Sequence, residues 1–347
     1  MKLITKRNFT QNFLEKKRKI ENMESLFKIF GRLEEKIIFV TNNSKLVGTI
    51  TDGDLRKNFF SINKFSLKKI MNKKPTYLTE KNYTFAYKKI NKKKIRYVPI
   101  VDKQKRIKSL LDLWADNNFD NKTEVIILAG GFGKRLKPYT NFVPKPMLRI
   151  NQNPHLEDLI KQIHDQGFNH ITILLHHKHD YIKKKIRQKF RNLEINFVIE
   201  DKPLGTAGGL TKVKYRNDGP LIVINSDLIT NLDLKNLVYY HHLSNADFTV
   251  SVKQKIDKLP FAAINLKKNK VTNIEEKPNR DYFFNAGIYM IKKDILKYLK
   301  KNKYFDMPTL ISNSIKKGKN IVAFNMHEDW EDYGSKETFF RLRKKKR

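Results

Sequence analysis

Residues Leu128 to Leu148 read LAGGFGKRLKPYTNFVPKPML, and this stretch decides how the rest of the chain is interpreted. The apolar run from Val125 to Ala129 leads into it and predicts a buried parallel strand. Ligands of open α/β sheets bind at the carboxyl ends of such strands. The glycines that follow lack Cβ atoms, so their backbone can take positive φ and bring N–H groups close to a bound phosphate, ribose or base. They are Gly130, Gly131 and Gly133.

Three basic residues accompany the glycine turn. Lys134 and Arg135 follow it directly, and Lys145 stands between two prolines. Arginine binds phosphate with a planar fork, and lysine supplies a compact charge. Close packing or an ordinary dinucleotide turn would also explain glycines after a strand, but the spacing fits neither GxGxxG nor the P-loop pattern.

Taken with PKPML, LAGGFGKRL resembles the sugar-1-phosphate nucleotidyltransferases, and mannose-1-phosphate guanylyltransferases in particular. These enzymes join a nucleoside triphosphate to a sugar phosphate. The resemblance implies that Leu128 and Ala129 also border the nucleotide, with the glycines and Lys134. It further implies that Arg135 holds the leaving phosphates and that Lys145 stabilises charge at the α-phosphate.

Length and composition limit the classes of protein. A chain of 347 residues is long enough for two domains. We find no stretch of about 20 apolar residues and no signal-peptide core, so we expect no membrane span and a cytoplasmic protein. Without cysteine, disulfides, thiolate zinc sites and a cysteine nucleophile are excluded.

The net charge of +37 raises the alternative of nucleic-acid binding. Residues 1–121 hold 29 basic and 12 acidic side chains, a charge of +17, which leaves +20 for residues 122–347. Lysine is spread over both halves rather than gathered in one patch. We therefore predict no specific nucleic-acid partner and expect attraction of anionic sugar phosphates and triphosphates.

The first third of the chain contains a repeat. Residues 37–57 and residues 97–116 both read as strand, polar turn and strand. Two such units resemble a tandem cystathionine-β-synthase-like (CBS) pair, a module that often senses adenine nucleotides. We predict this α/β module over residues 1–118.

In that family a G-x-x-T-x-x-D pattern holds ribose and phosphate, and Gly48, Thr51 and Asp54 match it here. The second copy departs from the pattern, so at most one regulatory nucleotide site is expected, at Thr51 and Asp54. Alternatively, Asp54 caps a helix starting near Leu55, and the module is structural or dimerising. We expect a homo-oligomer.

Residues 119–122 form the predicted linker to a catalytic domain at 123–347. Helical and strand patterns alternate there, which predicts a Rossmann-like three-layer α/β domain with a mixed, mostly parallel sheet. His176, His177 and His179 could suggest a metal site, but they lie at a strand end before a helix, and Asp180 is the only acidic residue between positions 166 and 193.

The segment LGTAGG, residues 204–209, brings a second glycine turn to the same sheet edge and resembles the base-reading segment of guanylyltransferases. The resemblance places Gly205 and Thr206 at the nucleotide and Glu200 near the guanine edge. A carboxylate can accept from both N1–H and the 2-amino group of guanine, which uracil and thymine lack. The glycines could also simply give a helix room against the sheet.

LIVINSD ends a predicted strand with Asp227, and WEDYG contains Asp332. Both match metal-binding aspartates of the family, whereas Asp227 alone could be a helix cap. Two carboxylates, phosphate oxygens and water suit Mg²⁺, which is the cofactor we predict.

The last motifs are E-K-P and N-x-G. In the family, the first carries a carboxylate for sugar hydroxyls and a lysine for the sugar phosphate, and the second borders the sugar. Glu276, Lys277, Asn285 and Gly287 match them, although Glu276 and Lys277 could belong to an exposed charged hairpin.

The sequence thus predicts Mg²⁺-dependent transfer of a nucleotidyl group, most simply GMP from GTP, to a sugar 1-phosphate with release of pyrophosphate. Uridylyl or thymidylyl transfer and a non-catalytic nucleotide sensor are the alternatives, and the sugar is left open.

Overall fold

The computed structural model describes residues 2–15, 20, 22–33, 35–59, 66–79, 95–113 and 123–345. A seven-stranded sheet organises the second part, with the strand order β10-β9-β8-β11-β16-β13-β17. The first four strands are parallel, β16 is antiparallel to both neighbours, and β17 is parallel to β13. The predicted mixed α/β sheet is therefore confirmed. Its strands are β8 (Glu124–Leu128), β9 (Ile171–Leu175), β10 (Ile195–Ile199), β11 (Leu221–Asn225), β13 (Phe248–Lys258), β16 (Asn279–Ile291) and β17 (Ile321–Met326).

Two apolar layers cover the sheet, one on each face. Because side chains alternate along a strand, Val125 and Ile127 pack in one layer and Ile126 in the other. The first layer includes the apolar stripes of α5, α6 and α8, and the second includes those of α7, η6 and α9. These helices are α5 (His155–Asp165), α6 (His179–Lys189), α7 (Gly205–Gly208), α8 (Leu234–Leu243), η6 (Lys293–Tyr298) and α9 (Met307–Lys316).

Short elements build the edge of the sheet where the strands of the parallel half end. The loop after β8 forms three 3₁₀ turns, and β12 pairs with β18 close to the end of β11. The C-terminal helix α10 packs Phe339 and Leu342 against Leu136 from the same loop. The elements are η2 (Lys134–Leu136), η3 (Tyr139–Asn141), η4 (Lys145–Met147), η5 (Gly209–Lys212), β12 (Leu228–Thr230), β18 (Trp330–Asp332) and α10 (Lys336–Lys345).

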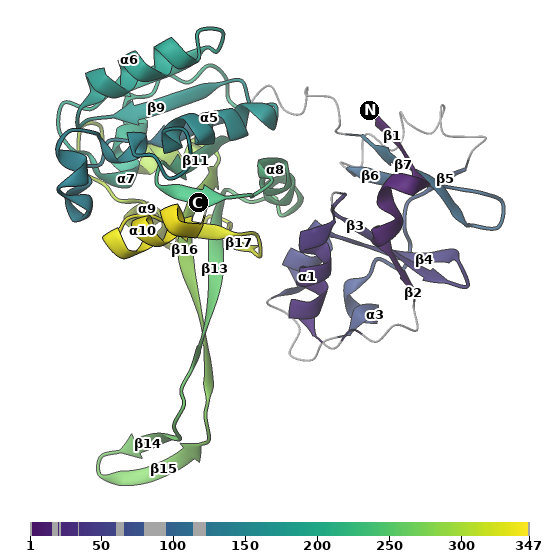
Figure 1. Ribbon diagram of the computed structural model, residues 1–347. Helices are drawn as coiled ribbons and strands as arrows, with labels where there is room; N and C mark the ends of the chain where they lie inside the picture. The colour runs from purple at the N-terminus through teal and green to yellow at the C-terminus, as the bar shows by residue number, and fades with distance from the viewer. Residues whose placement is uncertain are drawn as a thin grey trace.

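A long two-stranded arm leaves this domain. Beyond the body of the sheet, β13 and β16 continue as a ribbon that ends in the hairpin of β14 (Ala263–Lys267) and β15 (Lys270–Glu275). Figure 1 shows the hairpin at the far end of the ribbon, away from the helices that cover the sheet. We call residues 252–285 the arm.

The N-terminal part contains two small sheets with the same local plan. In one, β2 is parallel to β3 and β3 is antiparallel to β4; in the other, β5 is parallel to β6 and β6 is antiparallel to β7, which also pairs with β1. The predicted strand-turn-strand repeat is present, whereas its assignment as a CBS pair stays a prediction. The elements are β1 (Lys2–Thr5), η1 (Lys6–Asn12), β2 (Phe13–Glu15), α1 (Met23–Arg32), β3 (Ile37–Asn42), β4 (Lys45–Thr51), α2 (Asp52–Phe59), α3 (Leu67–Ile70), β5 (Leu78–Thr79), β6 (Tyr97–Val101) and β7 (Ile107–Asp112).

The predicted linker at 119–122 and the end of the second repeat copy lie outside the described residues. In the described part of the chain, no helix is long and apolar enough to cross a membrane.

A buried ion network joins the two parts. Arg56 of α2 is fully buried and donates to Asp52 at 2.6 Å and to Glu328 at 2.6 Å. Its guanidinium also lies 3.7 Å from the centre of the Phe324 ring and donates to the carbonyl oxygen of Asn325. Removing one partner of such a network leaves a buried charge uncompensated, so α2 is firmly anchored to the second part.

Candidate active site

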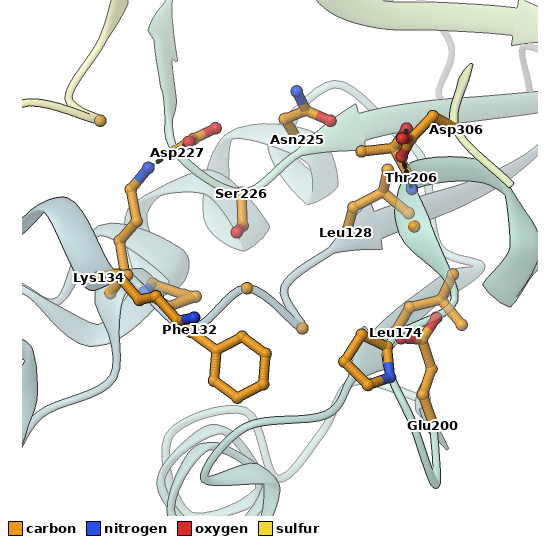
Figure 2. A pocket seen from close by; sticks show the side chains of 18 of the residues that line it. Leu128, Phe132, Lys134, Leu174, Glu200, Thr206, Asn225, Ser226, Asp227 and Asp306 are labelled. Carbon is orange, nitrogen blue, oxygen red and sulfur yellow. Dashed lines mark hydrogen bonds and ion pairs between the residues drawn. The ribbon is translucent and has the colours of Figure 1, made fainter. Parts of the chain in front are cut away.

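A pocket of about 470 Å³ opens at the carboxyl ends of β8 and β11. This is the size range of a site for a small organic ligand. Eleven of the residues predicted from sequence line it, which are Leu128, Gly130, Gly131, Gly133, Lys134, Arg135, Lys145, Glu200, Gly205, Thr206 and Asp227. Ala129 lies beneath the loop, buried, with its N–H donating to Leu174. Figure 2 shows Glu200 and Asp227 at opposite ends of the pocket.

The glycine loop is held against the lysine segment. Gly133 has φ of +64°, and a Cβ there would lie 2.9 Å from Cγ2 of Thr140 and 3.0 Å from Cβ of Lys145. The Thr140 hydroxyl also donates to the Gly133 carbonyl oxygen at 2.9 Å. The missing Cβ therefore lets the loop pack closely against Thr140 and Lys145, which places the loop and Lys145 on one side of the pocket, while the predicted approach of its N–H groups to a nucleotide stays a prediction.

Lys145 forms an ion pair with Asp227, which lies two residues after the end of β11. The Lys145 ammonium also lies 5.3 Å from the centre of the Tyr333 ring. Tyr333 is fully buried, and its hydroxyl donates at 3.3 Å to the carbonyl oxygens of Lys145 and of Ser226. Tyr333 thus braces both segments that carry the charged pair.

Asp332 lies beside this pair, at the end of β18. Its carboxylate accepts from the Gly334 N–H at 2.6 Å, and a Cβ on Gly334, which lines the pocket, would touch both Asp332 and Lys145. Burial and the nearby negative charge of Asp227 raise the pKa of Asp332. Two carboxylates that repel one another across a small space fit a divalent cation with oxygen ligands.

Glu200 occupies the other end of the pocket, where β10 ends. A Cβ on Gly209 would lie only 2.0 Å from Oε1 of Glu200, so the second glycine turn makes room for this carboxylate. Its Oε2 accepts from the Leu204 N–H at 3.5 Å, and its main-chain oxygen lies 2.8 Å from Nδ1 of His176. Burial raises the pKa of the Glu200 carboxyl.

Sequence reasoning missed several wall residues. Asp306 accepts from the Thr206 N–H at 3.1 Å and from the Tyr304 hydroxyl at 2.7 Å, and both Asp306 and Tyr304 line the pocket. Phe132, in the glycine loop, stands 5.4 Å from the His176 ring and 5.5 Å below the Lys134 ammonium. Only the position of Asp306 immediately before a helix with proline in its first turn could have drawn attention to it.

Of the four residues expected at the sugar, one lies beside the pocket and three are exposed on the arm. Gly287 lies beside the pocket: Asn225 lines the pocket, and a Cβ on Gly287 would lie 2.6 Å from the Asn225 amide nitrogen. Asn285 is exposed and donates to the Tyr289 hydroxyl at 2.7 Å. Glu276 and Lys277 are exposed where the ribbon of the arm meets its hairpin, and they do not line the pocket of their own chain.

In the N-terminal part, Thr51 and Asp54 bond to each other. The Asp54 carboxylate accepts from the Thr51 N–H at 2.8 Å, and the Thr51 hydroxyl accepts from the Asp54 N–H at 3.2 Å. This reciprocal pair is a capping box, and it starts the helix at Asp52 rather than near Leu55. The nucleotide site proposed for Thr51 and Asp54 is neither supported nor opposed by this arrangement.

Within the described residues, one group of three side chains has metal-ligand spacing, namely Asp52, His327 and Glu328. The Arg56 guanidinium already bonds to both carboxylates and supplies their counter-charge. This group is therefore an ion network of the interface, and His176, His177 and His179 form no such group.

Comparison with known proteins bears on this pocket. Residues 124–347 match the nucleotidyl transferase family. A D-glycero-alpha-D-manno-heptose 1-phosphate guanylyltransferase of Campylobacter jejuni is 29% identical over 196 residues, which are 56% of this chain and 87% of that protein. A UTP–glucose-1-phosphate uridylyltransferase of Synechocystis is 29% identical over 232 residues, 61% of this chain and 60% of that protein.

Among solved structures, HddC from Yersinia pseudotuberculosis complexed with GMP-PN is similar, with a TM-score of 0.51 and 28% identity. The similarity covers 64% of this chain and 98% of that one.

Proposed function

Because the chain belongs to the nucleotidyl transferase family, we propose that it transfers GMP from GTP to a sugar 1-phosphate, releasing pyrophosphate. The product would be a nucleotide-activated sugar for cell-surface glycan synthesis. One observation carries the proposal. The glycine loop, Lys145 and Asp227 line one end of a pocket whose other end holds Glu200, and Asp332 lies beside Asp227 next to this lining.

The chemistry needs no protein nucleophile, since a phosphate monoester is already an anion. Its oxygen attacks the α-phosphorus, the bond to the β-phosphate oxygen breaks, and pyrophosphate leaves. The protein contributes positioning and charge neutralisation. Arg135 would bind the leaving β and γ phosphates, and Lys145 would turn from Asp227 to the α-phosphate.

Asp227 and Asp332 would hold Mg²⁺ together with phosphate oxygens. When bound, the cation would supply Lewis-acid stabilisation of the charge on the transferring phosphate. Burial and, after it, the negative charge of Asp227 raise the pKa of Asp332, and a cation held between the two carboxylates would offset both effects.

The base assignment rests on Glu200. Its carboxylate lines the pocket at the end away from Asp227, where it can accept two hydrogen bonds from a guanine edge. Similarity to both guanylyl and uridylyl enzymes leaves uridylyl transfer as the rival within the family. Gly287 and Asn285, with Glu276 and Lys277, would serve the sugar phosphate. The N-terminal repeat would bind an adenine nucleotide as regulator.

The test is pyrophosphate release with Mg²⁺, using GTP, UTP, dTTP, CTP and ATP, each with a panel of sugar 1-phosphates. Release with GTP and one sugar supports the full proposal. Release with another triphosphate keeps the reaction and overturns the role of Glu200. If no combination of triphosphate and sugar 1-phosphate releases pyrophosphate, a non-catalytic nucleotide sensor is favoured.

The Glu200→Gln variant tests base selection separately. Loss of a charged acceptor for two N–H groups should lower kcat/KM for GTP about tenfold or more and affect UTP little. Asp201→Asn is the matched control, because Asp201 is exposed and pairs with Lys212 outside the pocket wall. Equal losses with both triphosphates would contradict the assignment.

A further inference from the structure

The arm ends in a hairpin with one apolar and one polar face. Ile264 stands opposite Ile274, and Leu266 stands opposite Val271. These four side chains are 54%, 62%, 63% and 56% exposed, respectively. Because faces alternate along a strand, Asn265 and Asn273 pair on the other face. An isolated two-stranded hairpin is marginally stable in water, and such an exposed apolar face indicates an interaction surface.

The ribbon holds the apolar face of the hairpin away from the domain that carries the arm. Seven consecutive residue pairs, from Val252 with Asn285 to Lys258 with Asn279, form a continuous antiparallel ladder. At about 3.4 Å per residue, the ladder carries the hairpin roughly 20 Å along the ribbon. Figure 1 shows it extended away from the sheet. With the ladder formed as it is, the hairpin lies at the far end of the ribbon and not at the pocket of its own chain.

Exposed aromatic side chains also occur at the pocket and on the segment that follows its glycine loop. Phe132 and Tyr304 line the pocket and are 40% and 63% exposed. Phe142, in the segment between the glycine loop and Lys145, is 85% exposed, and Tyr139 packs 5.3 Å from Phe340 with both rings partly open to solvent. One chain therefore exposes apolar side chains at two places that its own ladder keeps apart, and a second copy can bring them together.

We propose that the arm reaches a second copy of this chain, where its apolar face covers the rim of the partner's pocket. Glu276 and Lys277, which directly follow β15, then enter the sugar side of that pocket. Each active site is built from two chains. The nucleotide end comes from one copy and the acceptor-phosphate lysine from the other; the role of this lysine rests on the proposed function.

Mixing two defective variants tests the exchange. Asp227→Asn disables a pocket and leaves the arm intact, whereas Lys277→Ala impairs an arm and leaves the pocket intact. Because the effect of Lys277→Ala is expected on KM, release is measured with sugar 1-phosphate well below KM. If arms are exchanged, a mixed dimer contains one intact pocket served by one intact arm. Random co-assembly should then recover about one quarter of wild-type pyrophosphate release. If each arm serves its own chain, no site in the mixture is complete, and release no greater than the mean of the two variants overturns the proposal.

A measurement of mass tests the pairing without turnover. By light scattering, the wild-type chain should be a dimer, and Ile264→Ser with Ile274→Ser should shift it to monomer. Asn265→Ser with Asn273→Ser, on the opposite face of the same hairpin, should remain dimeric. A wild-type monomer, or an apolar-face variant that stays dimeric, overturns the proposal. If no triphosphate is turned over, the proposed function fails, while the masses still decide how the arm is used.

Discussion

The pocket and the arm both carry acidic and basic residues in short motifs, but the chain holds them in opposite ways. In the pocket, Lys145 is paired with Asp227 and braced by the buried Tyr333. On the arm, directly after β15, Glu276 and Lys277 are exposed, and neither forms an ion pair with any residue that the structure describes. The residues proposed for the nucleotide are thus preorganised within one chain, whereas those proposed for the sugar phosphate would reach a pocket only in the proposed pair of chains.

The largest effect is expected from neutralising the pocket carboxylate. Asp227→Asn removes the partner of Lys145 and one of the two carboxylates proposed for Mg²⁺. We expect kcat to fall by about 10²–10³-fold or more, because preorganised charge at the phosphate is lost. Steady-state pyrophosphate release measures it, and Asp218→Asn, on an exposed loop, should behave like the wild type. Turnover within a few fold of normal would remove Asp227 from the site.

The histidine buried behind the pocket should make the free energy of unfolding depend on pH. His155 is buried, 4.9 Å from the Tyr333 ring, and burial lowers its pKa from 6.5 to about 4. As pH falls below 6.5 the unfolded chain takes up a proton before the folded chain does, so stability is lost toward pH 4. The contribution approaches about 1.4 kcal/mol per pH unit.

Urea unfolding between pH 7 and pH 4 measures this loss. His155→Gln should make the slope shallower without removing it, because burial also lowers the pKa of His241, to about 3, and the pKa of His327. His242→Gln, whose side chain is exposed on α8, should leave the slope unchanged. An identical slope in the wild type and His155→Gln would show that other groups cause the acid sensitivity.

At the arm, the expected effect is on one substrate alone. Lys277→Ala should raise KM for the sugar 1-phosphate about tenfold or more, since a hydrogen bond to a charged group is lost, and leave KM for the triphosphate nearly unchanged. Lys270→Ala, in the same hairpin, is the matched control. A rise in the triphosphate KM instead would place Lys277 at the nucleotide.

The difference between the pocket and the arm also explains which features could be predicted from the sequence. Strand ends, glycine turns and their charged neighbours are local features, so the mixed sheet and the pocket residues from Leu128 to Asp227 could be inferred from pattern and resemblance. The position of Glu276 and Lys277 depends on whether β13 and β16 stop at the sheet or continue as a ribbon. Alternating residues allow both, because the pattern of a strand does not fix its partner or its direction.

Residues that act through tertiary contacts were missed for a similar reason. Asp306 reads as an ordinary helix cap, and only the approach of α7 brings Thr206 to it. The buried position of Arg56 could not be anticipated either, because its partner Glu328 lies 272 residues further along the chain.

The smallest effect is expected where the ribbon is open to water. Ile256 lies on β13 beyond the sheet and is 47% exposed, whereas Ile224 on β11 is 2% exposed. In chains dilute enough to be separate, Ile256→Ala should change the free energy of unfolding by no more than about 0.5 kcal/mol, while Ile224→Ala should cost about 2–5 kcal/mol. Denaturant titration compares the two. If Ile256→Ala costs as much as Ile224→Ala, the ribbon is packed against its own domain in solution, and the separation of the two halves of the site within one chain no longer holds.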